Sequence, residues 1–177
     1  MYEIVFAGFG GQGILASGVI LANAGMDEGK CVSWIPAYGA EQRGGTANCT
    51  VMIDDEEIGT PFYENPDILI AMNEPSLAMF KKIVKSDGLI IANSSLISKE
   101  KLKEDPRIVA VPAIDVAREV GDVRMANIII LGVLLNKIPV VSEHHMLEAI
   151  KAYFSSKGEK IILLNEKAYK RGSELVF

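Results

Sequence analysis

Short apolar runs alternate with longer amphipathic stretches along this chain, and the alternation predicts strands separated by helices. Strands are predicted at residues 2–7, 31–35, 67–72, 89–93 and 107–111. Helices are predicted between them at residues 13–28, 74–84, 98–104 and 114–120. Strands and helices that take turns in this way form parallel sheets covered by helices on both faces. The pattern therefore predicts an α/β fold: a three-layer α/β/α sandwich with a Rossmann-like, mostly parallel sheet.

Two features depart from this regular alternation. Pro36 is predicted to end the second strand, because proline cannot donate a hydrogen bond to a sheet. Residues 47–54 alternate apolar and polar, and the acidic turn at residues 54–56 is predicted to lead into a short strand around residues 57–59. Such an antiparallel hairpin makes the sheet mixed.

The C-terminal third is predicted to be mostly helical. Residues 123–137 are apolar nearly all round and are interpreted as a central helix, and residues 143–156 are amphipathic. Residues 161–164 are interpreted as a last strand before a final helix. No repeat, linker or low-complexity tract interrupts the 177 residues, so we expect residues 1–177 to form one domain.

Composition narrows the function classes. The formal net charge of -5 disfavours a general binder of nucleic acids or anionic membranes. No apolar run approaches the roughly 20 residues of a membrane span. The first strand begins near Tyr2, which leaves no room for a signal peptide. These observations predict a cytoplasmic protein.

Cysteines and histidines are few. Cys31 and Cys49 each lie in a strand pattern and are interpreted as small core residues without a disulfide. His144 and His145 follow Ser142 and are predicted to open a helix at the surface. A structural zinc site or an iron–sulfur cluster usually takes four ligands in paired spacing. If the protein takes part in redox chemistry, its metal centres must therefore lie on another chain.

The glycine-rich segment at residues 8–13 is the first candidate site. It joins the first strand to the first helix, where unpaired backbone N–H groups and the helix dipole attract an anion. Gln12 offers a neutral donor and acceptor for an amide or a phosphate oxygen. A dinucleotide site also requires an acid at the end of the second strand, and residues 33–36 supply none. A tight turn for close packing, a site for a phosphate-bearing group and a contact for a partner subunit remain as alternatives. The candidate ligand-binding or interface residues are Gly8, Gly10, Gly11, Gln12 and Gly13.

A second unusual loop follows the second predicted strand, so we expect it to leave the sheet at the same edge, where ligands of open α/β sheets collect. Glu41 and Arg43 could pair in solvent, or Arg43 could offer its planar fork to a carboxylate or phosphate. No Ser-His-Asp, Cys-His or paired-carboxylate pattern accompanies either loop, so no independent active site is predicted. The candidate residues here are Tyr38, Gly39, Glu41, Arg43, Gly44, Gly45 and Thr46.

Read together, these segments resemble the gamma subunit of the 2-oxoacid:ferredoxin oxidoreductases, equivalent to the gamma domain of pyruvate:ferredoxin oxidoreductase. The resemblance rests on residues 8–13 and 38–48, with further matches at residues 65–72, 93–97 and 124–132. It adds Arg124 and Asn127 to the candidate ligand-binding or interface residues. The second loop looks closer to the 2-oxoglutarate and branched-chain 2-oxoacid types than to the pyruvate type.

The resemblance implies a subunit that is not catalytic alone, within a complex that decarboxylates a 2-oxoacid to an acyl-coenzyme A and reduces ferredoxin. It implies that thiamine diphosphate and the iron–sulfur clusters lie on alpha, beta and delta partners, and that this chain binds no cofactor by itself. It also implies a contribution to the coenzyme A site, with self-association of gamma chains as a further possibility. A purely structural subunit and a free-standing nucleotide-binding protein are the alternatives.

Overall fold

A computed structural model describes residues 1–38, 46–60 and 64–177 of the chain. Its sheet has six strands in the order β2-β3-β1-β4-β5-β6. Strand β3 runs antiparallel to both of its neighbours, whereas β1, β4, β5 and β6 run parallel to one another. The predicted mixed, mostly parallel sheet is therefore confirmed. The strands are β1 (Tyr2–Phe9), β2 (Cys31–Tyr38), β3 (Thr46–Asp54), β4 (Ile68–Ala71), β5 (Leu89–Asn93) and β6 (Ile108–Val111).

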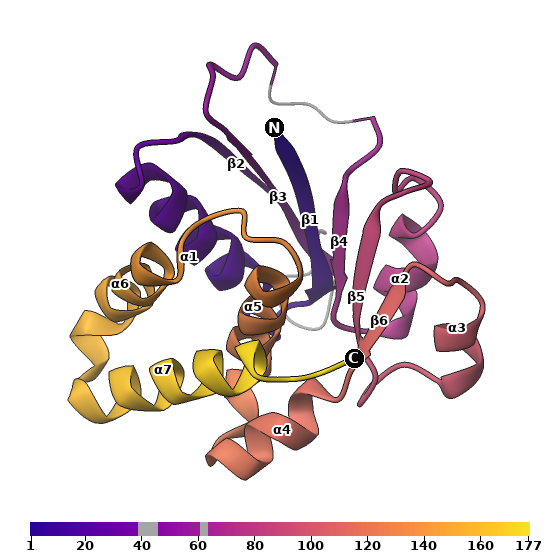
Figure 1. Cartoon of the computed structure of the whole chain (residues 1–177). Coiled ribbons are helices and arrows are strands. Elements are labelled where there is room, and N and C mark those ends of the chain that lie inside the picture. The colour runs from indigo at the N-terminus through magenta and orange to yellow at the C-terminus, as the bar shows by residue number, and fades with distance from the viewer. Residues whose placement is uncertain (39–45, 61–63) are drawn as a thin grey trace.

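Helices cover both faces of this sheet, as the predicted three-layer sandwich requires. Helices α1 and α5 pack on one face with α6 and α7 outside them, and α2 packs on the other face beside α3 (Figure 1). A 3₁₀ turn at Val123–Met125 leads into α5. The helices are α1 (Ile14–Asp27), α2 (Glu74–Phe80), α3 (Lys99–Lys103), α4 (Ala113–Val120), α5 (Ala126–Lys137), α6 (Glu143–Phe154) and α7 (Glu159–Ser173).

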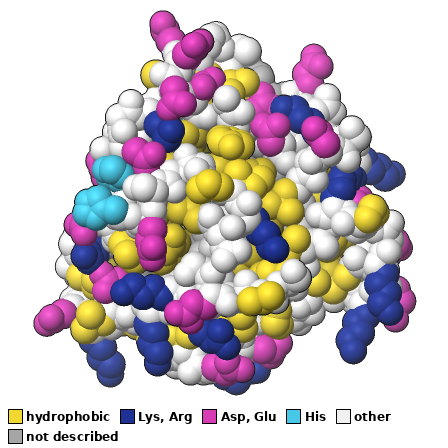
Figure 2. Space-filling model, in the orientation of Figure 1, with side chains coloured by type: hydrophobic (Ala, Val, Ile, Leu, Met, Phe, Trp, Pro, Cys, Tyr) yellow, Lys and Arg dark blue, Asp and Glu magenta, His cyan; other side chains and the backbone are white. Residues whose placement is uncertain are grey.

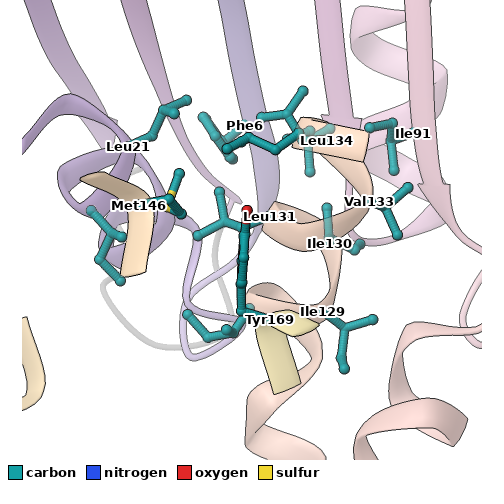
Figure 3. Packing of buried hydrophobic residues seen from close by; sticks show 14 of the residues in the cluster. Phe6, Leu21, Ile91, Ile129, Ile130, Leu131, Val133, Leu134, Met146 and Tyr169 are labelled. Carbon is teal, nitrogen blue, oxygen red and sulfur yellow. The ribbon is translucent and has the colours of Figure 1, made fainter. Parts of the chain in front are cut away.

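Helix α5 is the centre of the larger core. Its apolar residues are buried all round, because the sheet lies on one side and α7 on the other. Figure 3 shows Leu131 and Leu134 of α5 among Phe6 of β1, Met146 of α6 and Tyr169 of α7. The predicted central helix is confirmed, and it connects the sheet to the outer helices.

Two glycines set how closely α5 and α7 approach. A Cβ atom added at Gly132 would collide with the backbone carbonyl oxygen of Tyr169. One added at Gly172 would collide with the carbonyl oxygen of Ile129. The two backbones therefore touch directly, and no larger residue fits at the crossing.

Three sequence-based expectations about the elements are wrong. Strand β2 does not stop at Pro36 but continues to Tyr38, and it can do so because β2 is an edge strand whose outer side needs no donor. Residues 57–59 form no strand; the partner of β3 in the hairpin is β2. Residues 161–164 belong to α7 rather than to a strand, since a four-residue apolar run has no distinctive period.

The cysteines and histidines lie close to where the sequence predicted. Cys49 is buried and Cys31 half-buried, and both are free thiols. Burial raises the pKa of Cys49 to about 12 because the thiolate loses its hydration. Ser142 caps α6 by accepting a hydrogen bond from the backbone N–H of His145. His144 is exposed and His145 half-buried.

Hydrophobic side chains gather in the middle of the face that Figure 2 presents, with a Lys or Arg side chain beside them, and most charged side chains lie toward its margin. The centre of this face lies over α5 and the neighbouring strands (Figure 1). Among the described residues, none of the helices combines the length and hydrophobicity that crossing a membrane demands.

Candidate functional site

The two loops singled out in the sequence begin at the same edge of the sheet. Phe9, the last residue of β1, pairs with Thr46, and Tyr38, the last residue of β2, pairs with Ala47. The ends of β1 and β2 and the start of β3 are therefore level, which confirms the predicted common edge. Five candidates, Gly39, Glu41, Arg43, Gly44 and Gly45, lie outside the described residues.

The glycine loop between β1 and α1 needs its glycines for two different reasons. Gly11 and Gly13 have φ angles of 96° and 74°, which side chains rarely adopt. Gly8 and Gly13 also lie against neighbours, because an added Cβ would come within 2.6 Å of Ile14 Cδ1 or 2.5 Å of Asn127 Nδ2. The interpretation of this loop as a tight turn that allows close packing is therefore correct.

Gln12 holds the loop from inside. Its Oε1 accepts hydrogen bonds from the Phe9 backbone N–H at 2.7 Å and from Asn73 Nδ2 at 2.9 Å. Asn73 in turn caps α2 by accepting a hydrogen bond from the Ser76 N–H. The side-chain oxygen of Gln12, which the sequence suggested for a ligand, is therefore paired within the protein. The side-chain amide nitrogen of Gln12 is the group that remains for a ligand.

Asn127 holds the loop from the opposite side. At the start of α5, its Nδ2 donates to the Gly13 carbonyl oxygen at 3.3 Å and to Ser17 Oγ at 3.1 Å. Ser17 Oγ itself donates to the Gly13 carbonyl oxygen. This contact joins residues 114 positions apart and places Asn127 beside the loop.

Arg124 projects from the turn before α5. Its Nη2 lies 2.6 Å from Asp122 Oδ2, and its Nε also donates to that carboxylate. These hydrogen bonds lower the pKa of Asp122 and raise that of Arg124. The Arg124 side chain is 77% exposed, so the guanidinium can still meet a second anion.

Two hollows in the surface lie beside Arg124. The smaller, which we call the strand-end hollow, has a volume of about 190 Å³. The larger, which we call the helix-corner cavity, has a volume of about 470 Å³. Arg124 lines both. The strand-end hollow is otherwise lined by Gly11, Gln12, Met72, Asn93, Ile114, Val123 and Ala126, and the helix-corner cavity by Gly13, Ala16, Met125, Asn127, Tyr153, Phe154, Lys157, Ile161 and Asn165.

Several residues in or beside the two hollows are not among the site residues that the sequence predicts. Asn93 is the last residue of β5, and Asn73 lies just after the end of β4. Ligands of parallel sheets commonly bind at these ends of the strands. Asn93 is fully buried, and its Nδ2 donates to the Met72 carbonyl oxygen. Lys157 and Asn165 give no comparable signal, because Lys157 lies between the predicted helix at residues 143–156 and the predicted strand at residues 161–164, and Asn165 follows that strand.

The arrangement is suited to binding an anion rather than to acid–base chemistry. Within the described part of the chain, nothing accepts a hydrogen bond from the N–H groups of Gly10, Gly11 and Gly13. These donors lie at the start of α1, where the helix dipole adds positive potential. Strand β2 carries no acidic residue for a ribose, and no cluster of three potential metal ligands occurs in the three described ranges.

Known proteins share this sequence and fold. The family model described as pyruvate ferredoxin/flavodoxin oxidoreductase matches residues 3–175. The ketoisovalerate oxidoreductase subunit VorA of Methanothermobacter marburgensis is 42% identical over 97% of this chain. The chain spans only 36% of the length of that relative.

Two solved structures are similar over nearly the whole chain. The gamma subunit of a keto/oxoacid ferredoxin oxidoreductase from Geobacter sulfurreducens is 30% identical with a TM-score of 0.80, covering 98% of this chain and 97% of its own. The 2-oxoglutarate:ferredoxin oxidoreductase from Magnetococcus marinus, described with 2-oxoglutarate, coenzyme A and succinyl-CoA bound, is 26% identical with a TM-score of 0.87. The match covers 97% of this chain and 30% of that one. The chain therefore belongs to the pyruvate ferredoxin/flavodoxin oxidoreductase family and is similar to the gamma subunits within it.

Proposed function

We propose that this chain is the gamma subunit of a multisubunit 2-oxoacid:ferredoxin oxidoreductase, and that its glycine-loop edge forms part of the coenzyme A site. Such an enzyme converts a 2-oxoacid into an acyl-coenzyme A and passes electrons to ferredoxin. Thiamine diphosphate and the iron–sulfur clusters lie on the alpha, beta and delta partners in this proposal. The chain contributes subunit contacts and anion-binding groups.

The observation that carries the coenzyme A role is the set of available donors at the loop. The N–H groups of Gly10, Gly11 and Gly13 are unpaired within the described residues. Arg124 lines the strand-end hollow together with Gly11, and the helix-corner cavity together with Gly13. Coenzyme A carries phosphates, which such donors bind well. The relative from Magnetococcus marinus, described with coenzyme A bound, supports the same assignment.

The surface supports a role as a subunit. The face in Figure 2 carries hydrophobic side chains at its centre, and contiguous apolar surface on a soluble protein commonly marks an interaction site. Contact with alpha, beta or delta partners, or with a second gamma chain, would remove this surface from water.

The sharpest test of the coenzyme A role is Gln12→Glu in the assembled complex. Glutamate has a side-chain oxygen in the position of the Gln12 amide oxygen that accepts from Phe9 and Asn73, so the loop keeps its shape. It adds a negative charge where an anion is expected, and the KM for coenzyme A should rise about tenfold while the KM for the 2-oxoacid is unchanged. Asn23→Asp, the same charge change farther along α1, is the matched control and should alter neither constant.

The alternatives give different results. A purely structural subunit predicts that Gln12→Glu impairs assembly or changes nothing, with the KM for coenzyme A unchanged in whatever complex forms. A free-standing nucleotide-binding protein predicts tight NAD, FAD or ATP binding by the purified chain and no association with alpha, beta and delta. The proposal predicts that the purified chain turns over no 2-oxoacid and that activity appears when the partners are supplied.

A further inference from the structure

The helix-corner cavity has a chemistry that the glycine loop does not explain. It lies between the start of α1, the start of α5 and the corner where α6 meets α7, and it shares Arg124 with the strand-end hollow. Its volume of about 470 Å³ lies in the range typical of small-molecule sites, roughly 300–1,000 Å³. The cavity is therefore large enough for a ligand of its own.

A buried acceptor without a partner lines this cavity. Asn165 of α7 is fully buried, and its Nδ2 donates to the Ile161 carbonyl oxygen at 2.8 Å. Its Oδ1 is buried as well and accepts no hydrogen bond from any described residue. Buried amide oxygens are nearly always paired, because leaving one unpaired in a low-dielectric interior is unfavourable. A donor from outside the chain would complete the group.

The charges around the cavity favour a negatively charged ligand. Two cationic residues, Arg124 and Lys157, line it, and no carboxylate does, although the chain as a whole has a net charge of -5. Arg124 donates hydrogen bonds from Nε and Nη2 to the Asp122 carboxylate, and no described residue accepts a hydrogen bond from Nη1 of Arg124. Lys157 forms no ion pair within the described residues. The cavity therefore offers two sites for phosphate oxygens.

The remaining walls are apolar and aromatic. Tyr153 and Phe154 meet edge to face with ring centroids 5.0 Å apart, and Met125 and Ile161 lie in the same cavity. Aromatic side chains bind planar heterocycles by stacking. A ligand that fits all three features has a planar ring, an N–H donor for Asn165 and phosphate groups for the two cations.

We propose that the helix-corner cavity binds the base of an adenine nucleotide. The exocyclic amino group of adenine donates to Asn165 Oδ1, and the phosphates extend past Arg124 and Lys157. Two sources carry this chemistry: the 3′-phospho-ADP end of coenzyme A and a free adenine nucleotide. The first source rests on the proposed coenzyme A role, whereas the second does not.

The test is titration calorimetry on the full chain and on the assembled complex, with AMP, 3′-phospho-ADP, coenzyme A and, as a control lacking adenine, pantetheine phosphate. Wild type should bind the three adenine compounds. Lys157→Ala should weaken them about fivefold, and Lys160→Ala, in the first turn of α7 outside the cavity, should not. Asn165→Leu should weaken binding about tenfold while leaving the circular dichroism spectrum unchanged.

The outcomes separate this inference from the proposed function. If Gln12→Glu weakens coenzyme A binding but Lys157→Ala and Asn165→Leu do not, the coenzyme A role stands and this inference is wrong. If AMP binds and coenzyme A does not, the inference stands and the coenzyme A role fails. If Asn165→Leu affects only assembly with the partners, a partner side chain fills the cavity and the inference is overturned.

Discussion

At the scale of single residues, the glycine loop depends on side-chain amides as much as on its glycines. Gln12 and Asn127 hold its two ends, and each acts through atoms that face into the protein. The loop is therefore preorganised before any ligand arrives, which lowers the cost of binding one. The backbone N–H groups of the loop that are unpaired within the described residues can then donate hydrogen bonds to a ligand.

Gly13→Ala tests how far the loop depends on this packing. The new Cβ would lie within 2.5 Å of Asn127 Nδ2, at a φ angle of 74° that alanine adopts only under strain. Gly29→Ala is the matched control, because Gly29 has a φ angle of 84° and open space around it. We expect Gly13→Ala to lower the free energy of unfolding by about 1–3 kcal/mol more than Gly29→Ala. Equal losses in urea titrations would show that the Asn127 contact contributes nothing.

At the scale of elements, helices meet through specific polar and glycine contacts. The carboxylate of Glu28, at the end of α1, accepts a hydrogen bond from the backbone N–H of Ser142, which caps α6, and it lies 3.3 Å from His145 Nδ1. The backbone hydrogen bond from Ser142 holds the pKa of Glu28 below its ordinary value of 4.5. This contact ties two helices that are far apart in the sequence.

Glu28→Gln should reveal that contact through pH. A carboxyl whose pKa is depressed by folding stabilises the protein above its unfolded pKa and loses this contribution as pH falls through its folded pKa. Wild type should therefore exceed Glu28→Gln in unfolding free energy by roughly 1 kcal/mol at pH 7, and the difference should shrink in acid. Glu100→Gln, on the exposed surface of α3, is the control. A difference that does not change with pH would contradict the assignment.

Gly132→Ala tests the crossing of α5 and α7. Within a helix this substitution normally stabilises by about 1 kcal/mol. Here the added Cβ would meet the backbone oxygen of Tyr169, which cannot move without shifting α7. We expect a loss of at least about 2 kcal/mol in thermal or urea unfolding. Gly25→Ala in α1 meets a methyl group of Val32 instead and should cost much less.

At the scale of the whole molecule, the chain is organised around one sheet and the helix α5. Every other helix packs on the sheet, on α5 or on a neighbour of α5. The helices and the sheet therefore stabilise one another through the cores that they share. In the function proposed above, a partner chain covers the apolar centre of the face in Figure 2.

The expectation of one domain over residues 1–177 can be tested by unfolding. One cooperative unit should give coincident transitions by Trp34 fluorescence, which reports on β2, and by far-ultraviolet circular dichroism, which reports mainly on the helices. Two separated transitions would mean that parts of the chain unfold independently. Isolated gamma chains are sufficient for this measurement.

The order and type of most elements follow from the sequence alone, because hydrophobic period is a local property that survives folding. The long apolar run of α5 predicted a central helix, and the glycine loop was placed between the first strand and the first helix. The family resemblance added Arg124 and Asn127 to the candidate site residues, and the structure places both beside the glycine loop.

Other features were decided only by tertiary structure. Pro36 continues a strand because β2 lies at an edge, and residues 161–164 are helical because α7 packs across α5. The helix-corner cavity is built from helices distant in sequence, so no local pattern predicts it. Local periodicity determines which segments become strands or helices, whereas edges, crossings and cavities depend on contacts between residues far apart along the chain.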